Sequence, residues 1–232
     1  MSIRENIARV RENIAAAALA AGRKPEDITL VGASKMNDAA ACREAIAAGI
    51  DALGENRVQE MTQKLAENAY DGAPLHFIGH LQRNKVKLVV GKVALIESVG
   101  SYELLADIDR QAEKLGIVQP ILLEVNVGGE EAKSGFAVSE VRAAAEQAKA
   151  MAHITLRGLM TIPPVAEEAH GSIPYFEKVH SLFVDINENL YDNKLDILSM
   201  GMSGDYEDAV RCGATMVRVG TAIFGARHYA TI

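Results

Sequence analysis

The chain has 232 residues, of which 49% are hydrophobic and 24% are charged, and its formal net charge is −7. This length fits one large domain or two small ones, and the apolar fraction can form a substantial core, which argues against a disordered chain. The net negative charge argues against a nucleic-acid scaffold, which normally carries a basic stripe.

The predicted elements alternate between helices and strands. The first is a helix, because Ile3, Ile7, Val10 and Ile14 recur at helical spacing and Gly22 ends the pattern. Apolar runs of strand length follow, and helical patterns separate them. The predicted strands cover residues 28–34, 52–54, 76–79, 94–99, 120–126, 155–160, 196–200 and 216–220. The predicted helices between them cover residues 39–48, 57–68, 82–89, 102–115, 139–151, 175–190 and 206–212.

Eight strands that alternate with helices imply parallel βαβ units, and eight is also the number that closes a (β/α)₈ barrel. An open doubly wound sheet is the alternative, which the strand count disfavours. No linker is long enough to mark a second domain. The sequence therefore predicts an α/β fold, with one TIM-barrel domain over residues 1–232 and an extra N-terminal helix.

The sequence indicates no signal peptide, no membrane-spanning segment and no metal site. The N-terminus places Arg4 and Glu5 where a signal peptide needs an apolar run, and the longest apolar run, residues 14–21, is too short for a bilayer. Cys42 and Cys212 have neither a disulfide-framework spacing nor a zinc-ligand spacing. We expect a cytoplasmic protein that binds no membrane, no nucleic acid and no metal.

Polar residues gather where the predicted strands end. In a TIM barrel the loops at these ends build the site. The residues at the ends include Lys35, Asn56, His80, Asn126, Thr161, Ser203 and Thr221. His80 and Asn126 could equally be structural groups that stabilise loops.

Lys35 stands at the end of the first strand. Burial there disfavours the ammonium form, and a neutral amine is the nucleophile that attacks an aldehyde to form an imine. The alternative is a lysine that reaches solvent or pairs with a carboxylate such as Glu55.

The last two loops resemble a phosphate site. The loops after strands seven and eight often bind phosphate in TIM barrels, and here they contain Ser203, Gly204, Gly220 and Thr221. Glycine allows close backbone approach, and the two hydroxyls can donate hydrogen bonds. The alternative is that Ser203 and Thr221 are ordinary helix N-caps.

Arg218 shares a strand face with Met216 and Gly220. If this face lies inside the barrel, the guanidinium needs an acceptor. One candidate is the pyridine nitrogen of a pyridoxal 5′-phosphate ring. The other is an internal ion pair with Glu97 or Glu124, and the two can coexist.

These residues lie in segments that resemble the pyridoxal phosphate homeostasis protein family. The matching segments run in order through nearly the whole chain, and they are residues 31–35, 54–60, 76–82, 133–136, 158–162, 198–203 and 216–227.

The resemblance implies a barrel similar to the N-terminal domain of alanine racemase, with pyridoxal 5′-phosphate held as a Schiff base on Lys35. It further implies that Arg218 faces the pyridine nitrogen. Ser203, Gly220 and Thr221 match positions that hold the phosphate, and Asn56 and Met160 match positions near the cofactor.

Two functions follow from the resemblance. The first is pyridoxal 5′-phosphate homeostasis without evident turnover, with PLP-dependent apo-enzymes as partners. The alternative is an amino-acid racemase, which needs a proton donor and acceptor on opposite faces of the substrate. In the racemases the opposite group comes from a second domain, and this chain ends at Ile232, eleven residues after Thr221. We therefore expect a carrier, and a monomer, because the dimer contacts of those racemases use that domain.

Overall fold

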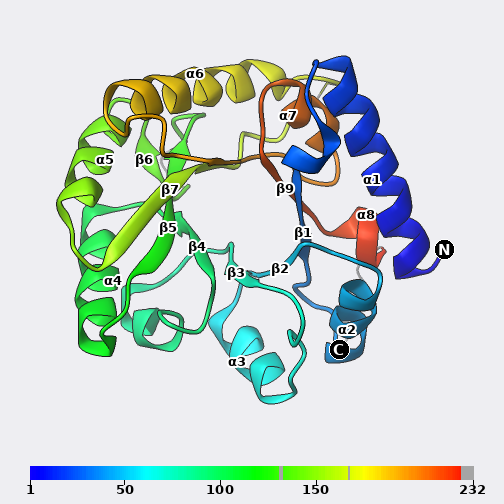
Figure 1. Cartoon of the computed structure of the whole chain (residues 1–232), viewed down its shortest axis with the longest axis horizontal. Helices are drawn as coiled ribbons and strands as arrows, with labels where there is room; N and C mark the ends of the chain where they lie inside the picture. Colours follow the sequence, from blue (N-terminus) through cyan, green and yellow to red (C-terminus); the bar gives the residue numbers. More distant parts are fainter. Residues whose placement is uncertain (131–132, 167, 226–232) are drawn as a thin grey trace.

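The computed structural model describes residues 1–130, 133–166 and 168–225. Within them, eight strands form a closed ring in the order β4-β3-β2-β1-β9-β8-β7-β5, which the pairing of β4 with β5 completes (Figure 1). Every pair is parallel. The barrel strands are β1 (Thr29–Ala33), β2 (Ala52–Glu55), β3 (Leu75–Phe77), β4 (Leu95–Val99), β5 (Gln119–Asn126), β7 (Ile154–Thr161), β8 (Ile197–Ser199) and β9 (Met216–Val219).

The helices surround the barrel on its outside (Figure 1). They are α1 (Ile3–Ala20), α2 (Ala39–Ala47), α3 (Val58–Ala66), α4 (Tyr102–Leu115), α5 (Val141–Ala150), α6 (Ile173–Asn189), α7 (Tyr206–Arg211) and α8 (Thr221–Phe224), with the 3₁₀ helices η1 (Pro25–Asp27) and η2 (Arg83–Leu88). The predicted closed α/β barrel is thus confirmed.

One predicted helix differs from the structure, and some short elements were not predicted. The predicted α-helix at residues 82–89 is the 3₁₀ helix η2, whose N-cap residue Gln82 makes no side-chain capping bond. Such short segments form 3₁₀ turns readily, because an α-helix needs several residues before its hydrogen bonds offset the ordering cost. The two-residue strand β6 (Phe136–Ala137), which pairs with β5 outside the ring, and the four-residue α8 are too short to give a periodic pattern.

The extra N-terminal helix begins with a capping box, in which the side chains of Ser2 and Glu5 bind each other's backbone N–H. It lies beside α7 and α8 (Figure 1). Asn6 donates a hydrogen bond to the carbonyl oxygen of Ile223 at 2.8 Å. Helix α1 therefore fixes α8, the element that follows the last strand, against the barrel.

The core has two layers. A large cluster fills the space between the helices and the barrel. A smaller cluster lies inside the ring, and its buried members are Val31, Ala52, Leu95, Leu122, Met160 and Met216. Since Met216 belongs to this interior cluster, its strand face points into the barrel, as Arg218 requires.

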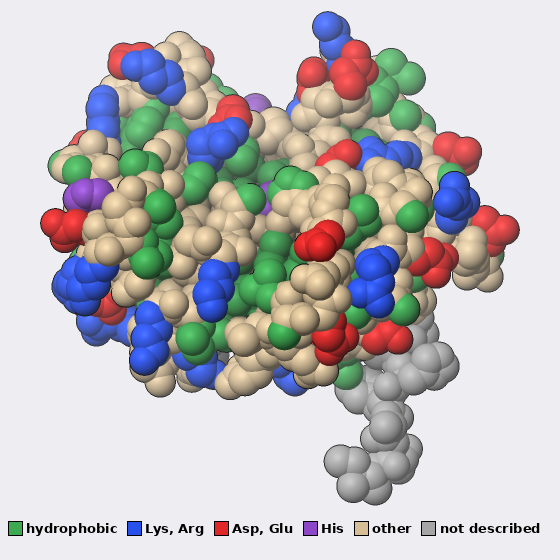
Figure 2. All heavy atoms as spheres, turned by 60° about the horizontal axis from the view of Figure 1, so that its bottom comes forward, with side chains coloured by type: hydrophobic (Ala, Val, Ile, Leu, Met, Phe, Trp, Pro, Cys, Tyr) green, Lys and Arg blue, Asp and Glu red, His purple; other side chains and the backbone are tan. Residues whose placement is uncertain are grey.

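The surface carries charges of both signs. Figure 2 shows Lys and Arg side chains interspersed with Asp and Glu over one face of the molecule. Among the described residues, none of the helices combines the length and the apolar character that crossing a bilayer requires.

Candidate functional site

Pairing of two strands brings Lys35 beside the loop that follows β9. Strand β1 pairs with β9, with Gly32 opposite Val219. Lys35 follows β1, and its side chain is half-buried. A Cβ atom on Gly220 would lie 3.4 Å from the carbonyl oxygen of Ala33, which ends β1. The predicted amine and the predicted phosphate loop therefore emerge from adjacent strand ends.

The loop after β8 contacts the loop after β9. The hydroxyl oxygen of Ser203 accepts hydrogen bonds from the backbone N–H groups of Gly220, at 3.1 Å, and Ala222, at 3.3 Å. Such convergent N–H groups are donors that phosphate oxygens use well. The N-cap alternative is wrong, because the N-caps of α7 and α8 are Asp205 and Gly220. Thr221 opens α8 and is exposed, and the amide of Ala222 was not predicted.

Arg218 is buried inside the barrel, with 3% of its surface exposed. Its Nη1 donates to the Ser199 hydroxyl at 2.6 Å, and its Nη2 donates to the carbonyl oxygen of Thr161 at 2.9 Å. The nearest carboxylate oxygen of Glu97 lies 3.9 Å away. This confirms the predicted internal ion pair with Glu97. A guanidinium has five N–H donors, so the pyridine-nitrogen hypothesis stays compatible with these bonds.

Glu97 lies between Arg218 and His76 and contacts both. One carboxylate oxygen lies 2.8 Å from His76 Nδ1, and the other accepts a hydrogen bond from Ser199 at 2.6 Å. Burial alone would raise the pKa of the Glu97 carboxyl. The hydrogen bond and charge of His76, the charge of Arg218 and the hydrogen bond of Ser199 outweigh burial and lower that pKa. Glu97 is therefore a carboxylate that balances the buried guanidinium.

Asn56 and Met160 occupy different layers of this site. Asn56 follows β2, and its Oδ1 is buried without a hydrogen-bond partner among the described residues. The loop is tightly packed, since a Cβ on Gly79 would lie 2.2 Å from the carbonyl oxygen of Asn56. Met160 is fully buried in the interior cluster. It sits opposite Ser199 in the β7–β8 pairing, next to the Arg218 contacts.

Asn126 stabilises the loop that follows β5. Its Nδ2 donates to the carbonyl oxygen of Glu130 at 2.8 Å, and its Oδ1 accepts from the Glu130 N–H at 3.2 Å. His80 is exposed and borders a pocket with Glu124, Asn126 and Lys133. Within the described residues, no group of three His, Cys, Asp or Glu side chains is placed to hold a metal ion.

Sequence reasoning missed a buried polar group behind Lys35, called here the Lys64 cluster, made of Ser34, Glu55, Glu60, Lys64 and Tyr70. Lys64 Nζ donates to the Ser34 carbonyl oxygen at 2.8 Å and to Glu55 Oε1 and Glu60 Oε1, each at 2.7 Å. Glu55 Oε1 also accepts from the Ser34 hydroxyl at 2.6 Å and the Tyr70 hydroxyl at 3.1 Å. Glu55, the alternative partner proposed for Lys35, thus forms its ion pair with Lys64.

The charges of the Lys64 cluster are linked. Burial raises the pKa of Glu55, and the hydrogen bonds and charge of Lys64 oppose this without cancelling it. Burial alone would lower the pKa of Lys64, but the hydrogen bond and charge of Glu55, with the hydrogen bond of Glu60, outweigh it and raise that pKa. One signal in the sequence could have revealed Lys64, because it follows the buried Met61 by three residues on the inner face of α3.

Comparisons with known proteins show the family to which the chain belongs. Residues 2–228 match the family model described as alanine racemase, N-terminal domain. The pyridoxal phosphate homeostasis protein of Aquifex aeolicus is 42% identical, and the match covers 99% of this chain and 100% of that protein. The chain belongs to the pyridoxal phosphate homeostasis protein family.

Two solved structures have a fold similar to that of this chain. The structure of PipY from Synechococcus elongatus with PLP bound has a TM-score of 0.83 and 34% identity, with 97% of this chain and 100% of that chain covered. An alanine racemase from Clostridium difficile in complex with cycloserine has a TM-score of 0.76 at 18% identity, and the match covers 99% of this chain and 60% of that chain. The second likeness shows a shared barrel fold alone. The last matching segment of the sequence ends at residues 226–227, which lie outside the described residues.

Proposed function

We propose that this chain binds pyridoxal 5′-phosphate at the mouth of the barrel and takes part in its homeostasis, with Lys35 as the covalent anchor. The observation that carries the proposal is the pairing of β1, whose end bears Lys35, with β9, whose end leads into the Gly220 loop with amides that converge on Ser203. An amine and a loop with convergent amides, which we propose to bind the phosphate, thus emerge from adjacent strand ends, near the buried guanidinium of Arg218.

The residues present fit this group. The phosphate would be held by Ser203, Gly220 and Thr221, and the pyridine nitrogen would face Arg218. Asn56 would contribute its buried Oδ1, which has no hydrogen-bond partner within the described part of the chain. Pyridoxal 5′-phosphate supplies an aldehyde, with which a primary amine condenses by forming a carbon–nitrogen double bond while the carbonyl oxygen leaves as water with both amine hydrogens.

Arg218 favours holding the group over catalytic turnover. Burial lowers the pKa of this guanidinium, and the charges of Glu97 and Glu124 oppose that effect. An arginine starts far above neutrality and stays charged, so it keeps a facing pyridine nitrogen unprotonated and the ring a poor electron sink. In this proposal the chain is a monomeric carrier that supplies PLP-dependent apo-enzymes.

An absorbance titration tests the covalent anchor. Adding pyridoxal 5′-phosphate to the purified protein should produce a visible band that free pyridoxal 5′-phosphate lacks, and Lys35→Ala should abolish it. A wild-type protein that shows no band would overturn the proposal. The carrier assignment has a separate test, since exchange of the α-hydrogen of alanine in deuterated water at enzyme-like rates would contradict it.

A further inference from the structure

The backbone on both sides of Lys35 is held from helix α3. The carbonyl oxygen of Ser34, the residue before Lys35, accepts a hydrogen bond from Lys64 Nζ at 2.8 Å. The N–H of Met36, the residue after it, donates to Glu60 Oε1 at 2.5 Å. The two α3 side chains bind each other at 2.7 Å, at positions i and i+4. The Glu60–Lys64 ion pair therefore binds the backbone both before and after Lys35.

The turn at Met36 needs such support. Its φ is +63°, in the left-handed region that a side chain disfavours, and its own side chain is half-exposed. Backbone in this region persists where the surrounding structure imposes it, and such sites concentrate where function demands a fixed orientation. Within the turn, Asn37 donates its backbone N–H to the Ser34 carbonyl oxygen and its Nδ2 to the Lys35 carbonyl oxygen, each at 3.1 Å. The Glu60 carboxylate is the contact that holds the Met36 N–H from outside the turn.

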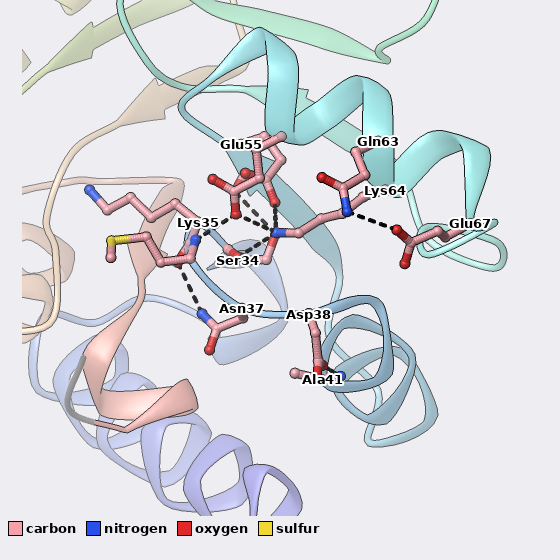
Figure 3. Close-up of polar contacts among 12 residues, drawn as sticks. Ser34, Lys35, Asn37, Asp38, Ala41, Glu55, Gln63, Lys64 and Glu67 are labelled. Carbon is pink, nitrogen blue, oxygen red and sulfur yellow. Dashed lines mark hydrogen bonds and ion pairs between the residues drawn. The ribbon is translucent and has the colours of Figure 1, made fainter. Parts of the chain in front are cut away.

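Lys64 fixes Glu60 in turn. Its side chain is 5% exposed, and its ammonium binds Ser34, Glu55 and Glu60. The Glu60 carboxylate, which accepts from the Met36 N–H, therefore cannot turn to solvent without taking one partner away from a buried cation. The Lys35 side chain extends away from Glu55 and Lys64 (Figure 3). The cluster therefore acts on the backbone of Lys35 and leaves its amine directed elsewhere.

We propose that Glu60 and Lys64 are positioning residues for Lys35, which clamp the backbone on either side of it and so aim its amine at the aldehyde of the incoming cofactor. The inference rests on the proposed function and deepens it. It predicts a selective defect, because the clamp bonds the backbone around Lys35 and involves none of the residues proposed to hold the phosphate or the ring.

Two variants at one position provide the test. Glu60→Ala removes the acceptor for the Met36 N–H, whereas Glu60→Gln keeps an oxygen there. We expect the visible band to form roughly tenfold more slowly, or slower still, in Glu60→Ala, because displacing a reacting group by a fraction of an ångström has effects of this size. Glu60→Gln should recover most of the rate.

A second ligand separates positioning from a general structural role. Pyridoxine 5′-phosphate has the ring and the phosphate but no aldehyde, so its affinity reports the pocket without the attachment to Lys35. Its dissociation constant, measured by calorimetry, should be the same in wild type, Glu60→Ala and Glu60→Gln. A parallel loss of analogue affinity in Glu60→Ala would overturn the inference, because the clamp would then support the whole pocket.

Controls cover folding and neighbouring positions. Gln63 lies on α3 beside Lys64 and binds Glu67, so Gln63→Ala should attach pyridoxal 5′-phosphate at the wild-type rate. Lys64→Met alone leaves Glu55 buried without its cation, so the double variant Lys64→Met/Glu55→Gln is used to keep the protein folded. This double variant should attach pyridoxal 5′-phosphate as slowly as Glu60→Ala.

The outcomes are distinguishable. A wild-type protein that forms no band fails the proposed function itself. A wild-type band together with wild-type attachment rates in Glu60→Ala and in the double variant overturns the clamp while leaving the proposed function intact.

Discussion

Two buried carboxylates, Glu55 behind Lys35 and Glu97 inside the barrel, each face a buried cation but are satisfied differently. Glu97 has a partner on each oxygen, His76 on Oε1 and Ser199 on Oε2. Glu55 gathers Ser34, Lys64 and Tyr70 on Oε1, while its Oε2 is buried without a hydrogen-bond partner among the described residues. The pKa of Glu97 is lowered and that of Glu55 is raised.

The two carboxyls differ in the donors and in the charges that surround them. Both groups lose hydration, which favours the neutral acid. At Glu97 the contacts with His76 and Ser199 and the charge of Arg218 offset that loss. At Glu55 the donors share one oxygen and the other is buried without a partner among the described residues, while the negative charge of Glu60 adds to burial in raising the pKa. Glu97 therefore acts as a fixed charge for Arg218, whereas Glu55 depends on Lys64.

The largest effect should come from removing the fixed charge. Glu97→Ala leaves Arg218 buried without its carboxylate, and breaking a buried pair in this way costs about 3–5 kcal/mol. Urea unfolding measures the loss. Glu113→Ala, at an exposed carboxylate on α4, is the control and should change stability by less than about 0.5 kcal/mol. A loss below about 1 kcal/mol for Glu97→Ala would contradict the balance described for Arg218.

Lys64→Met should cost somewhat less, about 3 kcal/mol near neutral pH. The unpaired Glu55 can take up a proton because its pKa is already raised, so the loss should shrink as the pH falls. Urea unfolding at several pH values measures this trend, and the double variant Lys64→Met/Glu55→Gln should recover most of the stability at neutral pH. Lys92→Met, at an exposed lysine, provides the matched control. A loss that is constant with pH would show that Glu55 does not titrate in the variant.

The two carboxyls should also give opposite pH slopes. The native pKa of Glu97 is lowered, so its stabilisation is present above the unfolded value of about 4.3 and is lost as the pH falls through the native pKa. The native pKa of Glu55 is raised, so its ionisation destabilises the protein at higher pH, and this penalty disappears as the pH falls toward about 4.3. Comparing the unfolding free energies of Glu97→Gln and Glu55→Gln with wild type across acid pH should give differences that change in opposite directions. Slopes of the same sign would refute the contrast.

The smallest effect concerns the third donor to Glu55. Tyr70→Phe removes the 3.1 Å hydrogen bond to Oε1 and leaves those of Ser34 and Lys64 in place. A loss of about 1 kcal/mol is expected in urea unfolding. A loss comparable to that of Lys64→Met would mean that the hydroxyl, and not the ammonium, is the main support of Glu55.

Much of the fold could be predicted because it depends on local patterns. Apolar runs such as Ile28–Ser34 and the helical repeat that begins at Ile3 mark their elements directly, and the strand count then indicates a closed barrel. Lys35 and Arg218 could be identified as candidate site residues because burying a cation at a strand end or on an inward face costs free energy and therefore calls for a partner.

The Lys64 cluster could not be predicted in the same way. Glu60 and Lys64 form an i,i+4 pair, which on most helices is a solvated surface feature. Their burial arises only when β1 and β2 align, with Ala33 opposite Gly54, and bring Ser34 and Glu55 against α3. The chain from His76 through Glu97 and Ser199 to Arg218 likewise joins four strands, and no stretch of sequence contains it.

Mapping the site of covalent attachment tests the central claim most directly. The purified protein would be incubated with pyridoxal 5′-phosphate, reduced with borohydride, digested and analysed by mass spectrometry. Lys35 should carry the added mass, with Lys64 unmodified because its ammonium is bound by three acceptors. Modification of Lys64 or another lysine in place of Lys35, or equal labelling of Lys35→Ala, would contradict the account.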